Sequence, residues 1–275
     1  MKKIVLFLLA VALCSCGQQA GGSGSSAYAD DSRPANYAQN GPRFKALLFY
    51  SEHEESAHVQ FAHQGLAFFR KLTVGEGFVV DSTQTLDGMT LEQLQEYNVI
   101  VALNAYPSRE ARPLFEQYME NGGGWLGFHA AAYNDSSTGW PWYVQFLGGG
   151  VFKCNNWPPQ PALLELDCTD HPVTKNLPAS YVAPTSEFYQ WTPSPRENPD
   201  VDVLVSLSPR NYPFGLKDII YGGDFPVVWT NRNYRMLYIN MGHGNEQFTD
   251  ATEQLLFVNA FRWIVSRDPA GNPFE

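Results

Sequence analysis

Residues 44–128 alternate between short apolar runs and segments whose apolar residues recur at helical spacing. The apolar runs have the length of strands: 44–50 (FKALLFY), 77–82, 97–103 (YNVIVAL) and 125–128. The segments between them predict helices over 58–72 and 109–120. Strands that alternate with helices form right-handed crossovers around a parallel sheet. The sequence therefore predicts an α/β fold of the flavodoxin-like type, a three-layer sandwich with a mostly parallel central sheet.

The middle of the chain, residues 133–198, lacks this alternation and is rich in prolines and aromatic residues. We expect a loop-rich insertion here, with one strand-like run over 162–166 that is antiparallel or peripheral. Regular structure resumes with predicted strands over 201–207, 226–230 and 236–241 and a closing helix over 251–266. Open α/β sheets bind ligands at the carboxyl ends of their strands, so we expect the insertion to cover that edge.

The chain begins with a basic and then apolar segment, MKKIVLFLLAVALCSC. Its apolar core is too short to anchor the protein by spanning a bilayer, so residues 1–15 are predicted to be a signal peptide. The letters LCSC resemble a bacterial lipobox, which predicts lipidation of Cys16; a signal peptide cleaved without lipidation is the alternative. Residues 16–43 are expected to be a flexible tether, 44–267 the folded domain and 268–275 a C-terminal tail. We therefore expect a protein of the bacterial cell envelope, held to the membrane through the lipid anchor only.

The formal net charge is −10, and no basic cluster interrupts this acidity. The charge argues against nucleic acid and anionic lipid surfaces as partners. Many of the tryptophans and tyrosines fall in apparent loops, which suits stacking against sugar rings; packing beneath the loops is the alternative. Cys154 and Cys168 are the cysteines of the predicted domain. An oxidising compartment permits a disulfide between them.

The stretch NGGGWLGFHAA leads through glycines into a short buried strand and then a turn. It resembles the sharp turn that presents a nucleophile at the carboxyl edge of an α/β sheet, with His129 at the nucleophile's position. Gly127 removes a side chain before the turn, and small residues follow it. A structural histidine that bonds a loop carbonyl is the alternative. We expect His129 to project from the sheet edge as a functional group.

A second histidine follows a predicted strand in the sequence MGHG, at His243. Two histidines at the carboxyl ends of parallel strands can converge on one cleft, and His58, at the start of the first helix, can reach the same rim. Glu187, in SEFYQW, is the candidate carboxylate, because its aromatic neighbours would desolvate it and raise its pKa. A helix-start residue and a surface charge are the structural alternatives for His58 and Glu187.

A zinc-binding helix is excluded for HEESAHVQFAH. His53, His58 and His63 are spaced by five residues, which rotates successive side chains by about 140° on a helix. The known zinc helices place two histidines four residues apart. His171 precedes a proline in a turn and is interpreted as structural.

The order FYS…H, YNVIV, NGGGWLGFHAA, WPWY, DHPVT, SEFYQW, PVVWT and MGH resembles the ThuA-like (trehalose utilisation) family over most of the predicted domain. The resemblance implies a fold like that of class I glutamine amidotransferases. In those enzymes the turn carries a cysteine, so His129 implies that glutamine hydrolysis through a thioester is not available. The family is associated with disaccharide utilisation, including processing through 3-keto sugars. The matching positions are Ser51, His58, His129, Trp142, Glu187 and His243.

Together these features predict an envelope protein that acts on small carbohydrates. His129 and His243 are expected to be acid/base residues, or ligands of a divalent metal such as zinc together with His58, and Glu187 assists them. The predicted substrate-binding residues are Ser51, His58, Tyr133, Trp142 and Trp191. A non-catalytic sugar-binding lipoprotein that uses the same cleft is the alternative.

Overall fold

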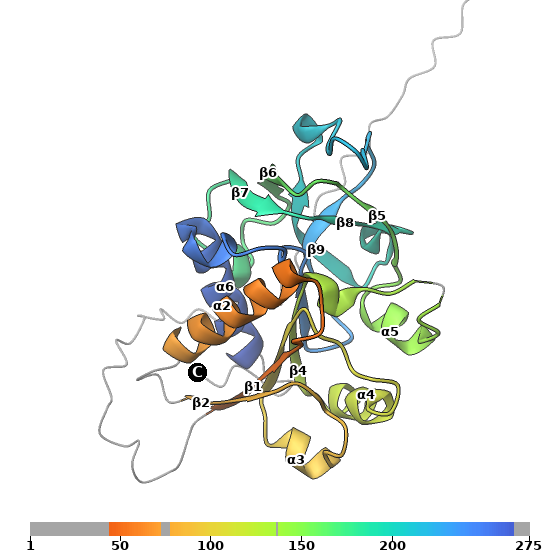
Figure 1. The fold of residues 1–275 in the computed structure, drawn as a ribbon, viewed down its shortest axis with the longest axis vertical. Coiled ribbons are helices and arrows are strands. Elements are labelled where there is room, and N and C mark those ends of the chain that lie inside the picture. Colours follow the sequence, from red (N-terminus) through yellow and green to blue (C-terminus); the bar gives the residue numbers. More distant parts are fainter. Residues whose placement is uncertain (1–43, 73–77, 136, 267–275) are drawn as a thin grey trace, which may run out of the picture. The chain divides into compact units, whose positions relative to one another are not determined.

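The computed structural model describes residues 44–72, 78–135 and 137–266. Within these residues nine strands form one sheet in the order β2-β1-β3-β4-β11-β10-β9-β6-β7. Figure 1 shows β2 and β1 toward one end of the molecule and β6 and β7 toward the other. Their bounds along the sheet are β2 (Phe78–Thr83), β1 (Phe44–Tyr50), β3 (Val99–Leu103), β4 (Gly124–Phe128), β11 (Met236–Ile239), β10 (Pro226–Asn231), β9 (Val201–Leu207), β6 (Gln160–Leu166) and β7 (Ser180–Ser186).

The first five strands of this order are parallel, and the last four continue the sheet by antiparallel pairing. Two strands, β10 and β6, run opposite to the rest, so the sheet is mostly parallel in direction, as predicted. In the parallel half, β4 lies between β3 and β11, with Phe128 paired to both Leu103 and Ile239. The carboxyl ends of these three central strands therefore meet at one edge.

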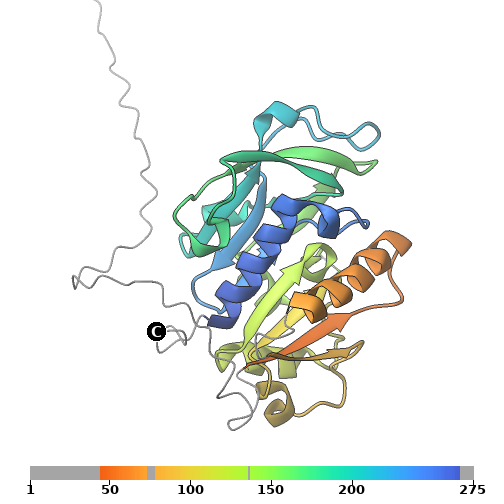
Figure 2. The ribbon, with the colours of Figure 1, turned by 90° about the vertical axis from the view of Figure 1, so that its left-hand side faces the viewer.

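Helices cover both faces of the sheet (Figure 2). On one face lie α2 (Ser56–Leu72) and α6 (Ala251–Ser266); on the other lie α3 (Leu91–Gln95), α4 (Arg112–Glu120) and α5 (Pro141–Phe146). Alternate residues of each strand point to opposite faces. In β1, for example, Leu48 packs in the core that includes α2 and α6, and Leu47 packs in the core that includes α4 and α5. The predicted three-layer α/β fold is confirmed.

Residues 133–198 are more regular than the sequence indicated. They contain α5, the sheet strands β6 and β7, and a two-stranded antiparallel sheet of β5 (Val151–Asn155) and β8 (Tyr189–Thr192). The strand expected over 162–166 is β6, and it is antiparallel to both of its neighbours, as predicted. The second predicted helix begins at Arg112 rather than at 109, because the preceding residues form a turn in which Ser108 Oγ accepts from Ala111 N.

No disulfide joins Cys154 and Cys168, the pairing that an oxidising compartment would have permitted. The Sγ atom of Cys154 bonds instead to Oε1 of Gln190, and Cys168 is buried in the core beside α6. The predicted signal peptide, Cys16, the tether and the C-terminal tail lie outside the described residues. Among the helices of the described residues, none has both the length and the apolar character that a membrane span requires.

Candidate functional site

Three histidines from distant parts of the sequence meet at the carboxyl edge of the parallel strands. His129 follows β4, His243 lies four residues beyond β11, and His58 lies in the first turn of α2. The His58 ring centroid is 5.1 Å from that of His129 and 5.1 Å from that of His243, and the other two centroids are 6.0 Å apart. All three side chains are buried. We call His58, His129 and His243 the histidine cluster; the predicted convergence of these residues is observed.

The turn that presents His129 has the backbone geometry of a constrained elbow. His129 has a φ of 44°, in the left-handed region that non-glycine residues rarely adopt. A short 3-10 helix, His129–Ala132, follows it in place of the longer helix that such turns usually precede. A Cβ atom on Gly127 would lie 1.9 Å from the Trp125 ring, so only glycine fits before this turn. The sequence at this turn therefore fixes the direction of the His129 side chain.

Two asparagines hold the cluster in place, and sequence reasoning missed both. Asn104, just after β3, donates to the backbone oxygens of His58 (3.3 Å) and Gly242 (2.7 Å) and accepts from Ala130 N (3.0 Å). Asn240, just after β11, accepts from His129 Nδ1 through its backbone oxygen at 2.9 Å. Its side chain bonds both backbone groups of Tyr189. Their position at strand ends, beside the histidine segments, is the signal that could have identified them.

The protonation of His129 follows from these contacts. A carbonyl oxygen can only accept, so Nδ1 donates to Asn240 and the neutral ring has a lone pair at Nε2. Burial is the main cause that lowers the pKa of His129 to about 3, which keeps the ring neutral. Nε2 lies 3.4 Å from Oε2 of Glu187 without a hydrogen bond. The short separation is therefore a contact between two groups with lone pairs, not a salt bridge.

Glu187 lies between β7 and β8 and is mostly buried beside His129. Burial raises the pKa of its carboxyl group above the ordinary value, as the aromatic neighbours in the sequence predicted. Its Oε1 atom accepts from Nδ2 of Asn155. Tyr189, two residues on, lies against the His129 ring with centroids 4.0 Å apart. The insertion thus supplies a carboxylate and an aromatic wall to the edge of the sheet.

His58 and His243 are the other two members of the cluster. Both ring nitrogens of His58 and Nε2 of His243 are buried and have no hydrogen-bond partner within the described part of the chain. Burial lowers the pKa of His58 to about 3, so this ring is also neutral. Nε2 of His243 lies 3.5 Å from Oε1 of the half-exposed Glu55. The arrangement presents several imidazole lone pairs to one small volume.

The predicted substrate-binding residues Tyr133, Ser51 and Trp191 do not all lie beside the histidine cluster. Tyr133 packs edge-on to Tyr189 (6.0 Å) and so lies near the cluster. Ser51 lies in the loop after β1, where its Oγ accepts from the backbone of His53. Trp191 is buried against Trp229 and Tyr238 in the core.

Trp142, which the sequence predicted to bind substrate, lies away from the cluster, and Trp157, which it did not predict, lies beside it. Trp142, a predicted binding residue, stacks on Phe146 of α5 and donates to Glu120 of α4, within the helical layer. Trp157, which sequence reasoning missed, lies edge-on to His243 with ring centroids 6.5 Å apart. Of these two tryptophans, Trp157 is therefore the one that lies beside the cluster.

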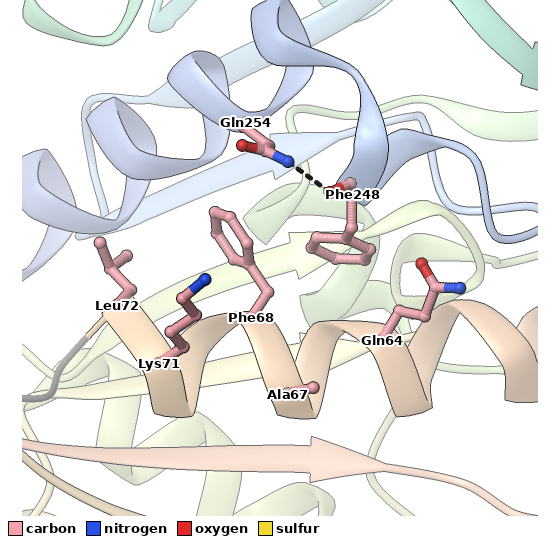
Figure 3. A pocket seen from close by; sticks show the side chains of 7 residues that line it. All are labelled: Gln64, Ala67, Phe68, Lys71, Leu72, Phe248 and Gln254. Carbon is pink, nitrogen blue, oxygen red and sulfur yellow. Dashed lines mark hydrogen bonds between the residues drawn. The ribbon is translucent and has the colours of Figure 1, made fainter.

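A pocket of about 570 Å³ lies elsewhere, between α2 and α6 (Figure 3). Its lining residues are Gln64, Ala67, Phe68, Lys71, Leu72, Phe248 and Gln254. None of them belongs to the histidine cluster or to the predicted binding residues. The pocket is therefore separate from the candidate site.

The fold and the site define an α/β protein with a histidine-rich site at the carboxyl edge of its sheet. Residues 46–264 match the ThuA family, described as trehalose utilisation, and the chain belongs to this family. The structure of a ThuA-like protein from Bacteroides uniformis ATCC 8492 is 65% identical with a TM-score of 0.83, and the match covers 88% of this chain and 99% of that one.

More distant relatives share the fold. A ThuA-like protein from Parabacteroides merdae ATCC 43184 is 19% identical with a TM-score of 0.58, over 84% of this chain and 91% of that one. The cytoplasmic protein STM1381 from Salmonella typhimurium LT2 is 13% identical with a TM-score of 0.53, over 80% of this chain and 99% of that one. A comparison with curated proteins finds no match.

Proposed function

We propose that this protein is an enzyme that processes carbohydrates, either glycosides or 3-keto sugars, at the histidine cluster. The observation that carries the proposal is the convergence of three buried histidines and Glu187 with ring nitrogens that no described protein group satisfies. Through Nδ1, His129 bonds a backbone carbonyl oxygen as a structural histidine does. Its Nε2 and both ring nitrogens of His58 have no such partner among the described residues. The family description, trehalose utilisation, supports a sugar as the substrate.

His243 is placed to move a proton, because its Nε2 has no hydrogen-bond partner among the described residues and lies 3.5 Å from Oε1 of the half-exposed Glu55. In a 3-keto glycoside the carbonyl group acidifies the C–H bond at C2, so a modest base can remove this proton. The electron pair of that bond forms a C1–C2 double bond while the C1–O bond breaks. The departing oxygen then takes up the proton from the His243 imidazolium. His129 and Glu187, which lie beside each other in the same cluster, hold the oxygen-bearing end of the sugar.

The test is turnover of trehalose, other disaccharides and their 3-keto derivatives by the wild type and by His243→Ala. We expect the variant to lose at least about 100-fold in rate, the range typical of a lost acid/base group. His63→Ala is the matched control, because His63 is an exposed histidine of α2 that pairs with Glu52 and should keep the wild-type rate.

Two results would contradict this proposal. One is turnover that His243→Ala leaves unchanged, which would show that His243 does not move the proton. The other is sugar binding by the wild type without turnover of any member of the panel. The second result would support the alternative, a non-catalytic sugar-binding protein that uses the same edge of the sheet.

The location of the protein is a separate proposal. The basic and apolar N-terminal segment and the LCSC letters support export and lipidation at Cys16, with the domain displayed at the cell envelope. Labelling of the wild type by radioactive palmitate, lost in Cys16→Ser, is the expected result. Equal labelling of both proteins would contradict lipidation at this residue.

A further inference from the structure

The histidine cluster has an unusual concentration of buried polar atoms without partners. Four ring nitrogens belong to this group within the described residues: both of His58, Nε2 of His129 and Nε2 of His243. Each unsatisfied buried polar group costs about 1–3 kcal/mol, so such atoms are rare and usually mark a bound ion, water or ligand. Four of them at one place indicate that the cluster is built to hold something.

The contact between His129 and Glu187 shows what kind of ligand fits. Nε2 of His129 presents a lone pair to Oε2 of Glu187 at 3.4 Å, and two electron-rich atoms at this distance repel each other unless a cation or proton lies between them. Ligand atoms about 2.0–2.2 Å from a tetrahedral zinc ion lie about 3.4 Å from each other. The observed separation is that of two ligands on one such ion.

His58 supplies the third ligand. One ring nitrogen of His58, one of His129 and a carboxylate oxygen of Glu187 all lie within 4.8 Å of one another, and all three side chains are buried. Because Nδ1 of His129 donates to the backbone oxygen of Asn240, its Nε2 atom carries a lone pair that a metal can accept. Two imidazoles and one carboxylate are a common ligand set for catalytic zinc.

Groups around two of the three ligands, His129 and Glu187, hold them as metal ligands are usually held. Nδ1 of His129 donates to the backbone oxygen of Asn240, which fixes the ring and directs Nε2 toward Glu187. The second carboxylate oxygen of Glu187 accepts from Asn155. Such second partners orient the ligands of metal sites and are present here for both His129 and Glu187.

We propose that His58, His129 and Glu187 bind one divalent transition-metal ion of the zinc class. His243 and Glu55 lie on the more exposed side of the same cluster, next to His58, where substrate reaches the ion. This inference deepens the proposed function, because it names the cofactor of the same site and rests on that site being the active site. A bound ion of this class polarises a carbonyl oxygen or a water molecule.

The experiment measures Zn²⁺ binding by isothermal titration to the untagged, chelator-treated protein, without sugar. We expect the wild type to bind one equivalent of Zn²⁺ tightly. The Zn²⁺ affinity should fall at least about tenfold in His58→Ala and in Glu187→Gln, the effect typical of the loss of a group at a metal site. His63→Ala is the control, because it removes an exposed histidine from the same helix. Mg²⁺, which prefers oxygen ligands, is expected not to compete. Circular dichroism confirms that each variant is folded.

Any of three results would overturn the inference. The first is a wild-type protein that binds no Zn²⁺ at all, and the second is a Zn²⁺ affinity that His58→Ala and Glu187→Gln leave unchanged. The third result is an equal loss of Zn²⁺ affinity in the control, His63→Ala. Because sugar is absent, failure here is distinct from failure of the proposed function: a protein that turns over sugar without binding Zn²⁺ refutes the metal site alone. Zn²⁺ binding without sugar turnover refutes the enzyme alone.

Discussion

Nε2 of His129 lies 3.4 Å from Oε2 of Glu187, with a lone pair rather than a proton directed at the carboxylate. The two residues are far apart in the sequence, and each is fixed from behind. Asn240 holds His129, and Asn155 holds Glu187. The chain therefore holds an imidazole lone pair and a carboxyl oxygen close together in a buried position. We interpret this contact as the signature of a site whose ligand lies between the two side chains.

Gly242 allows the close approach of the His243 segment to His129. A Cβ atom at Gly242 would lie 2.5 Å from Cβ of His129 and 3.2 Å from Oδ1 of Asn104. Gly242→Ala is therefore expected to displace His129, to cost about 1–3 kcal/mol of stability through overpacking, and to weaken Zn²⁺ binding at least about tenfold. Isothermal titration and denaturant unfolding measure both effects.

Gly244→Ala is the control for this change. Gly244 has a φ of 102° and open space around its Cα, so alanine strains the backbone there but contacts no cluster residue. We expect a stability loss of about 1–3 kcal/mol with Zn²⁺ affinity unchanged. Equal Zn²⁺ affinity in Gly242→Ala and the wild type would contradict the assigned role of Gly242.

Glu253 makes stability depend on pH at a place away from the cluster. It is fully buried in the first turn of α6, and desolvation raises its pKa to about 8. The folded chain thus keeps a proton that an unfolded glutamate, with a pKa of 4.5, has lost. The stability from this group is present below pH 4.5 and is lost as the pH rises to about 8.

Glu253→Gln removes this titration. The free energy of unfolding of the variant relative to the wild type should rise between pH 4.5 and 8, by on the order of 3 kcal/mol at pH 7. Denaturant unfolding over this pH range measures the difference, with the exposed Glu246→Gln as control. A difference that is independent of pH would show that Glu253 does not hold a proton in the folded protein.

Substitutions of Trp157 and Trp142 compare a tryptophan beside the cluster with one in the helical layer. Trp157 lies edge-on to His243, whereas Trp142 stacks within α5. We expect Trp157→Ala to weaken sugar binding about tenfold or more, equivalent to about 1.4 kcal/mol, and Trp142→Phe to leave it unchanged. Calorimetric titration with a disaccharide that the wild type binds measures this. The reverse order of effects would favour the residue that the sequence predicted.

The fold and the principal site residues could be predicted because both depend on local signals. Apolar runs placed β4 and β11 correctly, and parallel strands bring their carboxyl ends together, so His129 and His243 had to lie at one edge. Glu187 was identified by its aromatic neighbours in the sequence, and its side chain is buried as that identification required. For the two histidines the inference needed only the type of element and the position of the residue beyond its end.

What could not be predicted depends on contacts between distant segments. β6 joins the main sheet through pairs such as Leu164 with Leu207, and no periodicity in 133–198 indicates that partner. Trp142 and Trp157 have similar sequence surroundings, and only packing decides that one faces α4 and the other His243. The role of Asn104 likewise arises because three separate segments converge on its amide.

Anomalous diffraction at the zinc edge, from crystals of the untagged protein soaked in Zn²⁺, measures directly whether the histidine cluster binds a metal. We expect one strong peak about 2.0–2.2 Å from Nε2 of His129, from Oε2 of Glu187 and from a ring nitrogen of His58. If zinc occupied surface groups such as His63 with Glu52 but left the cluster without a peak, the proposed metal site would be wrong.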